Sequence, residues 1–92
     1  MPRVEAFAVD GLALRFFSHD HLPPHFQAEK SGRWEVRVRF MRHTSEMIEV
    51  LSKNAPRLSE LKELKRLAER HRVALLHEWE TKVAIKEPGA DE

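Results

Sequence analysis

Hydrophobic and polar residues alternate most strictly in residues 33–41. One face of this segment would carry Trp34, Val36, Val38 and Phe40, and the other Arg33, Glu35, Arg37 and Arg39. A period of two residues is typical of a strand with one buried and one solvated face. The pattern therefore predicts a strand of an antiparallel sheet with Trp34 in the core. Trp79 is also expected in the core, because it lies on the apolar stripe of the helical half.

Shorter segments with strand character flank this one. Residues 3–9 and 12–17 predict a hairpin around Asp10-Gly11, a dipeptide that favours a type I′ turn. Residues 25–29 and 46–51 predict two further strands, and Lys30-Ser31-Gly32 supplies turn chemistry before residue 33. We therefore expect an antiparallel sheet of about four to five strands.

The second half of the chain has helical periodicity. Apolar positions recur every three or four residues, at Leu58, Leu61, Leu64, Ala68, His71, Leu75, Trp79 and Val83. Asn54 is the expected N-cap, with Pro56 in the first turn. A single helix over residues 57–85 would be roughly 43 Å long, which exceeds a compact domain of this size. Either the helix breaks near His71-Arg72, or it projects and packs on a second subunit.

Strands followed by helices predict the α+β class, as a single domain over residues 1–85 with a disordered acidic tail at 86–92. The sequence contains no cysteine, which suits a reducing compartment. It shows neither a signal peptide nor an apolar run long enough for a membrane span. We expect a cytoplasmic protein that does not enter the membrane.

Net charge is +1, but residues 33–72 carry eleven basic and six acidic side chains. This basic middle suits an anionic partner such as RNA, or it forms a solvated surface of mixed charge.

Histidines gather in residues 18–28, where His19, His21 and His25 lie beside Asp20. Imidazole changes charge near neutral pH and is the commonest metal ligand. One hypothesis is therefore a metal site built from the three histidines, although their spacing matches no standard signature. The alternative is a stiff loop whose imidazoles form structural hydrogen bonds. We expect no cofactor.

A catalytic hypothesis uses the same segment. His25 would act as a general acid or base, oriented by Asp20 or His21. The cations Arg33, Arg37 and Arg39 would bind the phosphate of a substrate such as RNA. His71, on the apolar stripe of the helix, would join this composite site if the helix packs over the sheet.

The run Asp20-His21-Leu22-Pro23-Pro24-His25-Phe26-Gln27-Ala28 resembles the Asp-His-x-Pro-Pro-His-Phe-His-Ala motif of a small bacterial family of unknown function. The helical residues His71, Leu75 and Trp79 are similar to a second pattern of that family. Its members are encoded in two-gene cassettes and are often classed with toxin–antitoxin proteins. The resemblance implies a compact α+β protein that acts with a small protein partner. Gln27 stands where the family usually has histidine, which weakens a metal site there.

Three functions remain open from the sequence. The first, which we favour, is a toxin–antitoxin component that acts by binding a protein, with an activity on RNA left open. The second is a non-enzymatic binding module that forms a homodimer or higher oligomer. The third is a small metal-binding protein.

Overall fold

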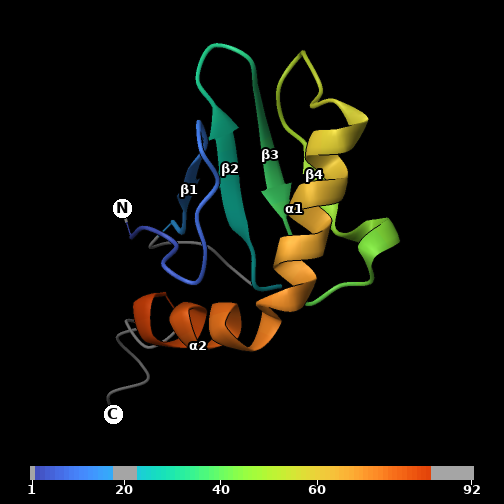
Figure 1. Cartoon of the computed structure of the whole chain (residues 1–92). Coiled ribbons are helices and arrows are strands. Elements are labelled where there is room, and N and C mark those ends of the chain that lie inside the picture. The colour runs from blue at the N-terminus through green and yellow to red at the C-terminus, as the bar shows by residue number, and fades with distance from the viewer. Residues whose placement is uncertain (1, 18–22, 84–92) are drawn as a thin grey trace.

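The computed structural model describes residues 2–17 and 23–83 and has an α+β fold (Figure 1). The elements in chain order are β1 (Ala13–Arg15), β2 (Phe26–Lys30), β3 (Trp34–Val38), a 3₁₀ turn η1 (Thr44–Glu46), β4 (Ile48–Val50), α1 (Leu58–Arg70) and α2 (Arg72–Lys82). The four strands form one antiparallel sheet in the order β1-β2-β3-β4. The predicted antiparallel sheet followed by helix is confirmed, and of the two alternatives for the helical half the structure has the broken helix.

The sheet has one buried face, and the period of two along β3 is the reason. Trp34, Val36, Val38 and Phe40 are all buried, as the alternation predicted. Their neighbours on β2, Phe26 and Ala28, are also fully buried because the register places them opposite Val38 and Val36. Figure 1 shows α1 lying over the sheet and α2 crossing its end.

The first hairpin differs from the prediction. Residues 3–9 form no regular strand, and only Arg3 makes a bridge, to Arg15. The turn is not type I′, because Gly11 has a positive φ of 83° and Asp10 does not. The Leu12 N–H donates to the carbonyl of Val9 at 3.1 Å, so the turn spans residues 9–12 and Gly11 is its third residue. A turn in which only the third residue has a positive φ is of type II.

The start of α1 also differs from the prediction. Its N-cap is Arg57 rather than Asn54, whose carbonyl instead accepts a hydrogen bond from the Ser52 hydroxyl. Glu60 takes over the capping role, because its carboxylate accepts the backbone N–H of Arg57 at 2.9 Å. Leu58, placed on the buried stripe by its spacing, is 76% exposed.

The helix breaks at His71, one of the two alternatives, although no glycine or proline marks the position. His71 is the C-cap of α1 and the N-cap of α2, with φ −104° and ψ 21°. Next to it, the Arg72 guanidinium donates to the carbonyls of Phe40 at 2.7 Å and Arg42 at 3.3 Å. Tertiary contacts with the segment that follows β3 therefore accompany the break.

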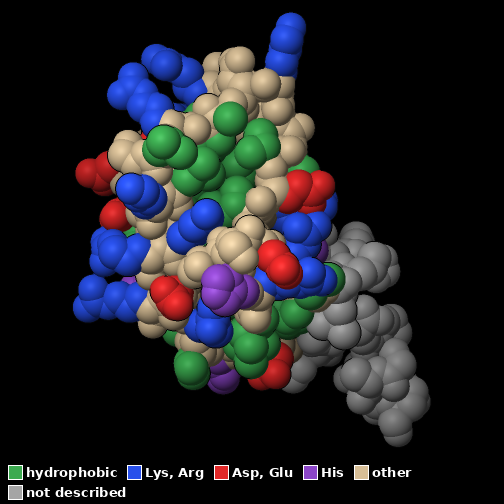
Figure 2. Space-filling model, turned by 90° about the vertical axis from the view of Figure 1, so that its right-hand side faces the viewer, with side chains coloured by type: hydrophobic (Ala, Val, Ile, Leu, Met, Phe, Trp, Pro, Cys, Tyr) green, Lys and Arg blue, Asp and Glu red, His purple; other side chains and the backbone are tan. Residues whose placement is uncertain are grey.

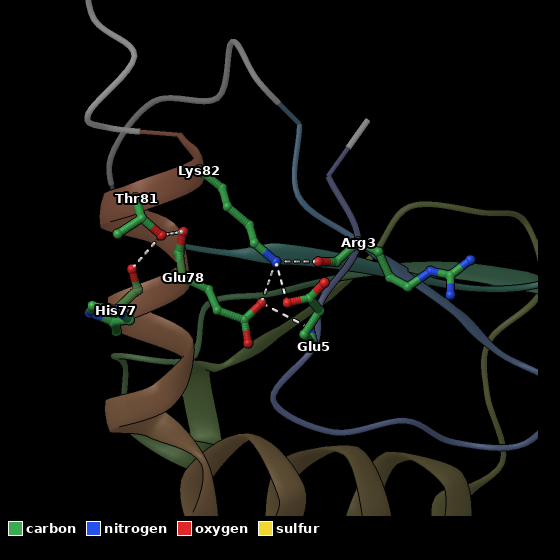
Figure 3. A network of polar contacts seen from close by, with 6 residues as sticks. All are labelled: Arg3, Glu5, His77, Glu78, Thr81 and Lys82. Atoms are coloured by element: carbon green, nitrogen blue, oxygen red, sulfur yellow. Dashed lines mark hydrogen bonds and ion pairs between the residues drawn. The ribbon is translucent and has the colours of Figure 1, made fainter.

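The end of α2 is tied to the N-terminal segment (Figure 3). The ammonium of Lys82 donates to the carbonyl of Arg3 at 2.9 Å and lies 3.0 Å from Glu78 and 3.4 Å from Glu5. Glu78 also accepts the backbone N–H of Glu5 at 2.8 Å. These contacts hold residues 3–5 against α2.

Candidate functional site

His25, the proposed acid or base, lies directly before β2 and is 7% exposed. Its Nδ1 is 2.9 Å from the carbonyl of Pro23. Its ring lies against Trp79 of α2, with centroids 5.6 Å apart and planes at 46°. The side chain is therefore packed between the sheet and α2. Its burial and its contacts are those of a histidine with a structural role.

The other members of the histidine segment, His19, Asp20 and His21, lie outside the described residues. The orientation of His25 by Asp20 or His21 stays a prediction. Within residues 2–17 and 23–83, no group of three histidine or acidic residues is arranged to hold a metal ion.

His71 is partly buried at the junction of α1 and α2, where it stacks on Phe7. The two ring centroids are 5.3 Å apart and the planes differ by 22°. Trp79, the neighbour of His25, is eight residues further along α2, or about 12 Å at the rise of a helix. His25 and His71 thus pack on different aromatic rings at separate points of the core.

Arg37 and Arg39 are brought together by an acidic residue that the sequence did not single out. Both guanidinium groups donate to Oε1 of Glu49 on β4, from Arg37 at 2.9 Å and from Arg39 at 2.6 Å. The hydrogen bond from Arg39, followed by the charges of both arginines, holds the pKa of Glu49 below its usual value. One carboxylate therefore offsets part of the charge that would bind a phosphate.

Arg33 lies at the other end of β3 from Arg39, in the exposed turn after β2. The register pairs Lys30 with Trp34 at this end and Phe26 with Val38 at the other. Five residues of strand separate Arg33 from the end that holds His25, or about 17 Å. The structure does not place Arg33 beside the histidine.

One recess of the molecule runs between β1 and the N-terminal segment, with a volume of about 610 Å³. Its lining is Arg3, Val4, Phe7, Ala8, Leu12, Ala13, Leu14 and Arg15. The lining contains no histidine, acid or hydroxyl group, so this recess does not supply an acid–base pair.

A different surface stands out on the face that carries β4 and α1. Figure 2 shows hydrophobic side chains gathered there, with lysines and arginines around them. The exposed members are Val50 at the end of β4 and Leu58 at the start of α1. Ile48 and Leu61 lie partly buried on the same two elements. These four residues are called the β4–α1 surface below.

Sequence periodicity missed this surface for a simple reason. It assigned Leu58 to the buried stripe and residues 46–51 to a strand, but gave no distance between helix and strand. The exposure of Val50 at 41% and Leu58 at 76% follows from how far α1 covers the sheet. That property depends on tertiary packing rather than on local pattern.

The described helices include none that is long and apolar enough to cross a membrane. Comparison with curated proteins and with solved structures finds no match to the chain. A family model described as a domain of unknown function, DUF4160, matches residues 11–80, which include β1 to β4, α1 and most of α2. The chain therefore belongs to the DUF4160 family of unknown function.

Proposed function

We propose that this chain works by binding a small protein partner, as one component of a two-gene cassette of the toxin–antitoxin kind. The observation that carries the proposal is the β4–α1 surface, where Val50 and Leu58 expose apolar side chains. Apolar side chains that gather on one face and are rimmed by polar residues mark interaction sites in soluble proteins. The resemblance of residues 20–28 to a cassette family supports the choice of a protein as the partner.

The geometry gives less support to action on RNA. His25 is buried, Arg37 and Arg39 share Glu49, and Arg33 lies at the far end of β3. A ribonuclease would require an accessible imidazole beside cations that are available to the phosphate. Binding of single-stranded RNA also favours exposed aromatic rings, and Trp34 and Trp79 are both buried.

The test is co-expression of the tagged chain with the product of the adjacent gene, followed by size-exclusion chromatography. We expect the two proteins to elute together at a fixed ratio after the tag has been removed. Separate elution at micromolar concentrations, with both proteins folded by circular dichroism, would contradict the proposal.

A further inference from the structure

The outer edge of β4 has backbone groups available for another strand. Residues of an antiparallel pair alternate between hydrogen-bonded and non-hydrogen-bonded positions. The N–H of Arg39 donates to Met47 at 2.7 Å, and that of Leu51 donates to Glu35 at 2.8 Å. Glu49 lies two residues from Met47 and two residues from Leu51, so its backbone N–H and C=O groups also face β3.

The residues between them, Ile48 and Val50, therefore direct their backbone N–H and C=O groups away from β3. They pair with Val38 and Val36 without ladder hydrogen bonds. In the described part of the chain, β4 has β3 as its only neighbouring strand. Two donors and two acceptors thus lie along an open edge, the arrangement that accepts an added strand.

Apolar side chains lie beside this edge. Ile48 and Val50 point to the same side of the sheet as Val38 and Val36, which are fully buried, yet Val50 is 41% exposed. Figure 1 shows α1 lying over the β4 side of the sheet, and this helix carries Leu58 and Leu61. The helical spacing puts these two leucines on the flank opposite Glu60, which contacts Lys30 of β2. An added strand would therefore pack its apolar side chains between β4 and α1.

The charge around this surface is positive. Lys53, Arg57, Lys62 and Lys65 follow β4 or lie on α1, and none forms an ion pair within the described residues. The two acids at the start of α1 are already paired, Glu60 with Lys30 and Glu63 with Arg66. A partner strand with acidic residues would complement this rim.

A second copy of this chain fits the edge less well. Antiparallel pairing of two β4 strands through Ile48 and Val50 would put Glu49 directly opposite Glu49 of the other copy. Like charges at directly opposed positions destabilise a sheet. The cationic rims of the two copies would also repel each other. The charge pattern favours a different protein.

We propose that the partner adds one strand to the free edge of β4, and that this strand carries alternating apolar side chains and acidic residues. The inference rests on the proposed function and defines its mode of binding. The apolar side chains contact Val50, Leu58 and Leu61, while the acids face Lys53, Lys62 and Lys65. Backbone hydrogen bonds form at Ile48 and Val50.

The experiment measures hydrogen exchange of individual amides by NMR, with and without the adjacent-gene product. We expect the amides of Ile48 and Val50 to exchange at least about tenfold more slowly in the complex. Val50→Pro removes one outward N–H without removing a ladder bond to β3, and proline is tolerated at such edge positions. Val50→Ala is the matched control, since it shortens the side chain and keeps the N–H. We expect Val50→Pro to bind about tenfold more weakly than Val50→Ala.

The outcomes separate the two proposals. Strand addition is overturned if a complex forms but exchange at Ile48 and Val50 is not slowed, and if Val50→Pro binds the partner as tightly as Val50→Ala. That result would leave protein binding itself standing. Absence of any complex overturns the proposed function itself. Protection of the same amides in the chain alone, rising with its concentration, would instead identify a second copy as the occupant and overturn the inference.

Discussion

The imidazole of His25 lies against the indole of Trp79, with ring centroids 5.6 Å apart, so the motif segment and α2 meet inside the core. Trp79 also has the ring of Phe16 at 6.4 Å in an edge-on arrangement. The two most distinctive parts of the sequence, the Pro-Pro-His-Phe run and the helical tryptophan, are thus joined by packing. This relationship gives both parts a structural role.

The first prediction concerns His25. Replacing His25 by alanine removes a buried ring from Trp79 and the contact with the Pro23 carbonyl, so we expect a loss of about 1–3 kcal/mol in the free energy of unfolding. In a domain of this size, each kcal/mol lowers the thermal midpoint by roughly 4–8 °C. Differential scanning calorimetry measures the shift in the thermal midpoint. An unchanged thermal midpoint in this variant would contradict the structural role of His25.

The second prediction concerns pH. The carboxylate of Glu60 accepts hydrogen bonds from Lys30 and from the Arg57 backbone, and these lower its pKa from 4.5. A depressed pKa in the folded state contributes stability above the unfolded value, which is lost as pH falls through the folded pKa. We expect Glu60→Gln to be less stable than the unmodified chain at neutral pH, with the difference shrinking below pH 4.5. Urea unfolding across this range measures it, and a difference that stays constant down to about pH 2 would refute the assignment.

The third prediction concerns RNA. Since Arg37 and Arg39 share the carboxylate of Glu49, we expect the unmodified chain to bind single-stranded RNA weakly. Glu49→Ala releases both guanidinium groups, and we expect its affinity to rise several-fold, with a steeper dependence on salt. Fluorescence anisotropy with a labelled oligonucleotide tests this. Tight binding by the unmodified chain, unaffected by Glu49→Ala, would favour an RNA-directed function at another surface.

The fourth prediction concerns the N-terminal segment. Lys82→Met removes the hydrogen bond to the Arg3 carbonyl and the ion pairs to Glu5 and Glu78, while keeping much of the apolar stem. We expect faster exchange of the Glu5 amide and a loss of about 1 kcal/mol in stability. Lys62→Met is the control, because Lys62 is exposed and makes no ion pair with a described residue. Equal behaviour of the two variants would show that these contacts do not hold the segment.

Sequence pattern predicted the sheet well where alternation was strict, and the buried side chains of β3 match it residue by residue. It also predicted the helical stripe. The length of that stripe left open whether the helix breaks, and the structure places the break at His71. It missed the cap at Arg57, because the capping hydrogen bond comes from the Glu60 carboxylate rather than from an N-cap side chain. It missed the exposure of Leu58, because that depends on how far α1 covers the sheet. For the candidate site, sequence identified His25, Arg37 and Arg39 but not Glu49, whose role arises from strand pairing. Spacing along one chain carries no information about such cross-strand neighbours.

Binding of a protein partner at the β4–α1 surface can be tested at Leu58, which is 76% exposed. Leu58→Glu replaces an exposed leucine in the first turn of α1, where an acid suits the helix dipole, so the fold should be retained. Val73→Glu is the matched control, because Val73 is 84% exposed in the first turn of α2, outside this surface. Isothermal titration with the adjacent-gene product should show Leu58→Glu binding at least about tenfold more weakly than the unmodified chain, and Val73→Glu binding as tightly. Equal affinity of Leu58→Glu and the unmodified chain would show that the partner does not bind at this surface.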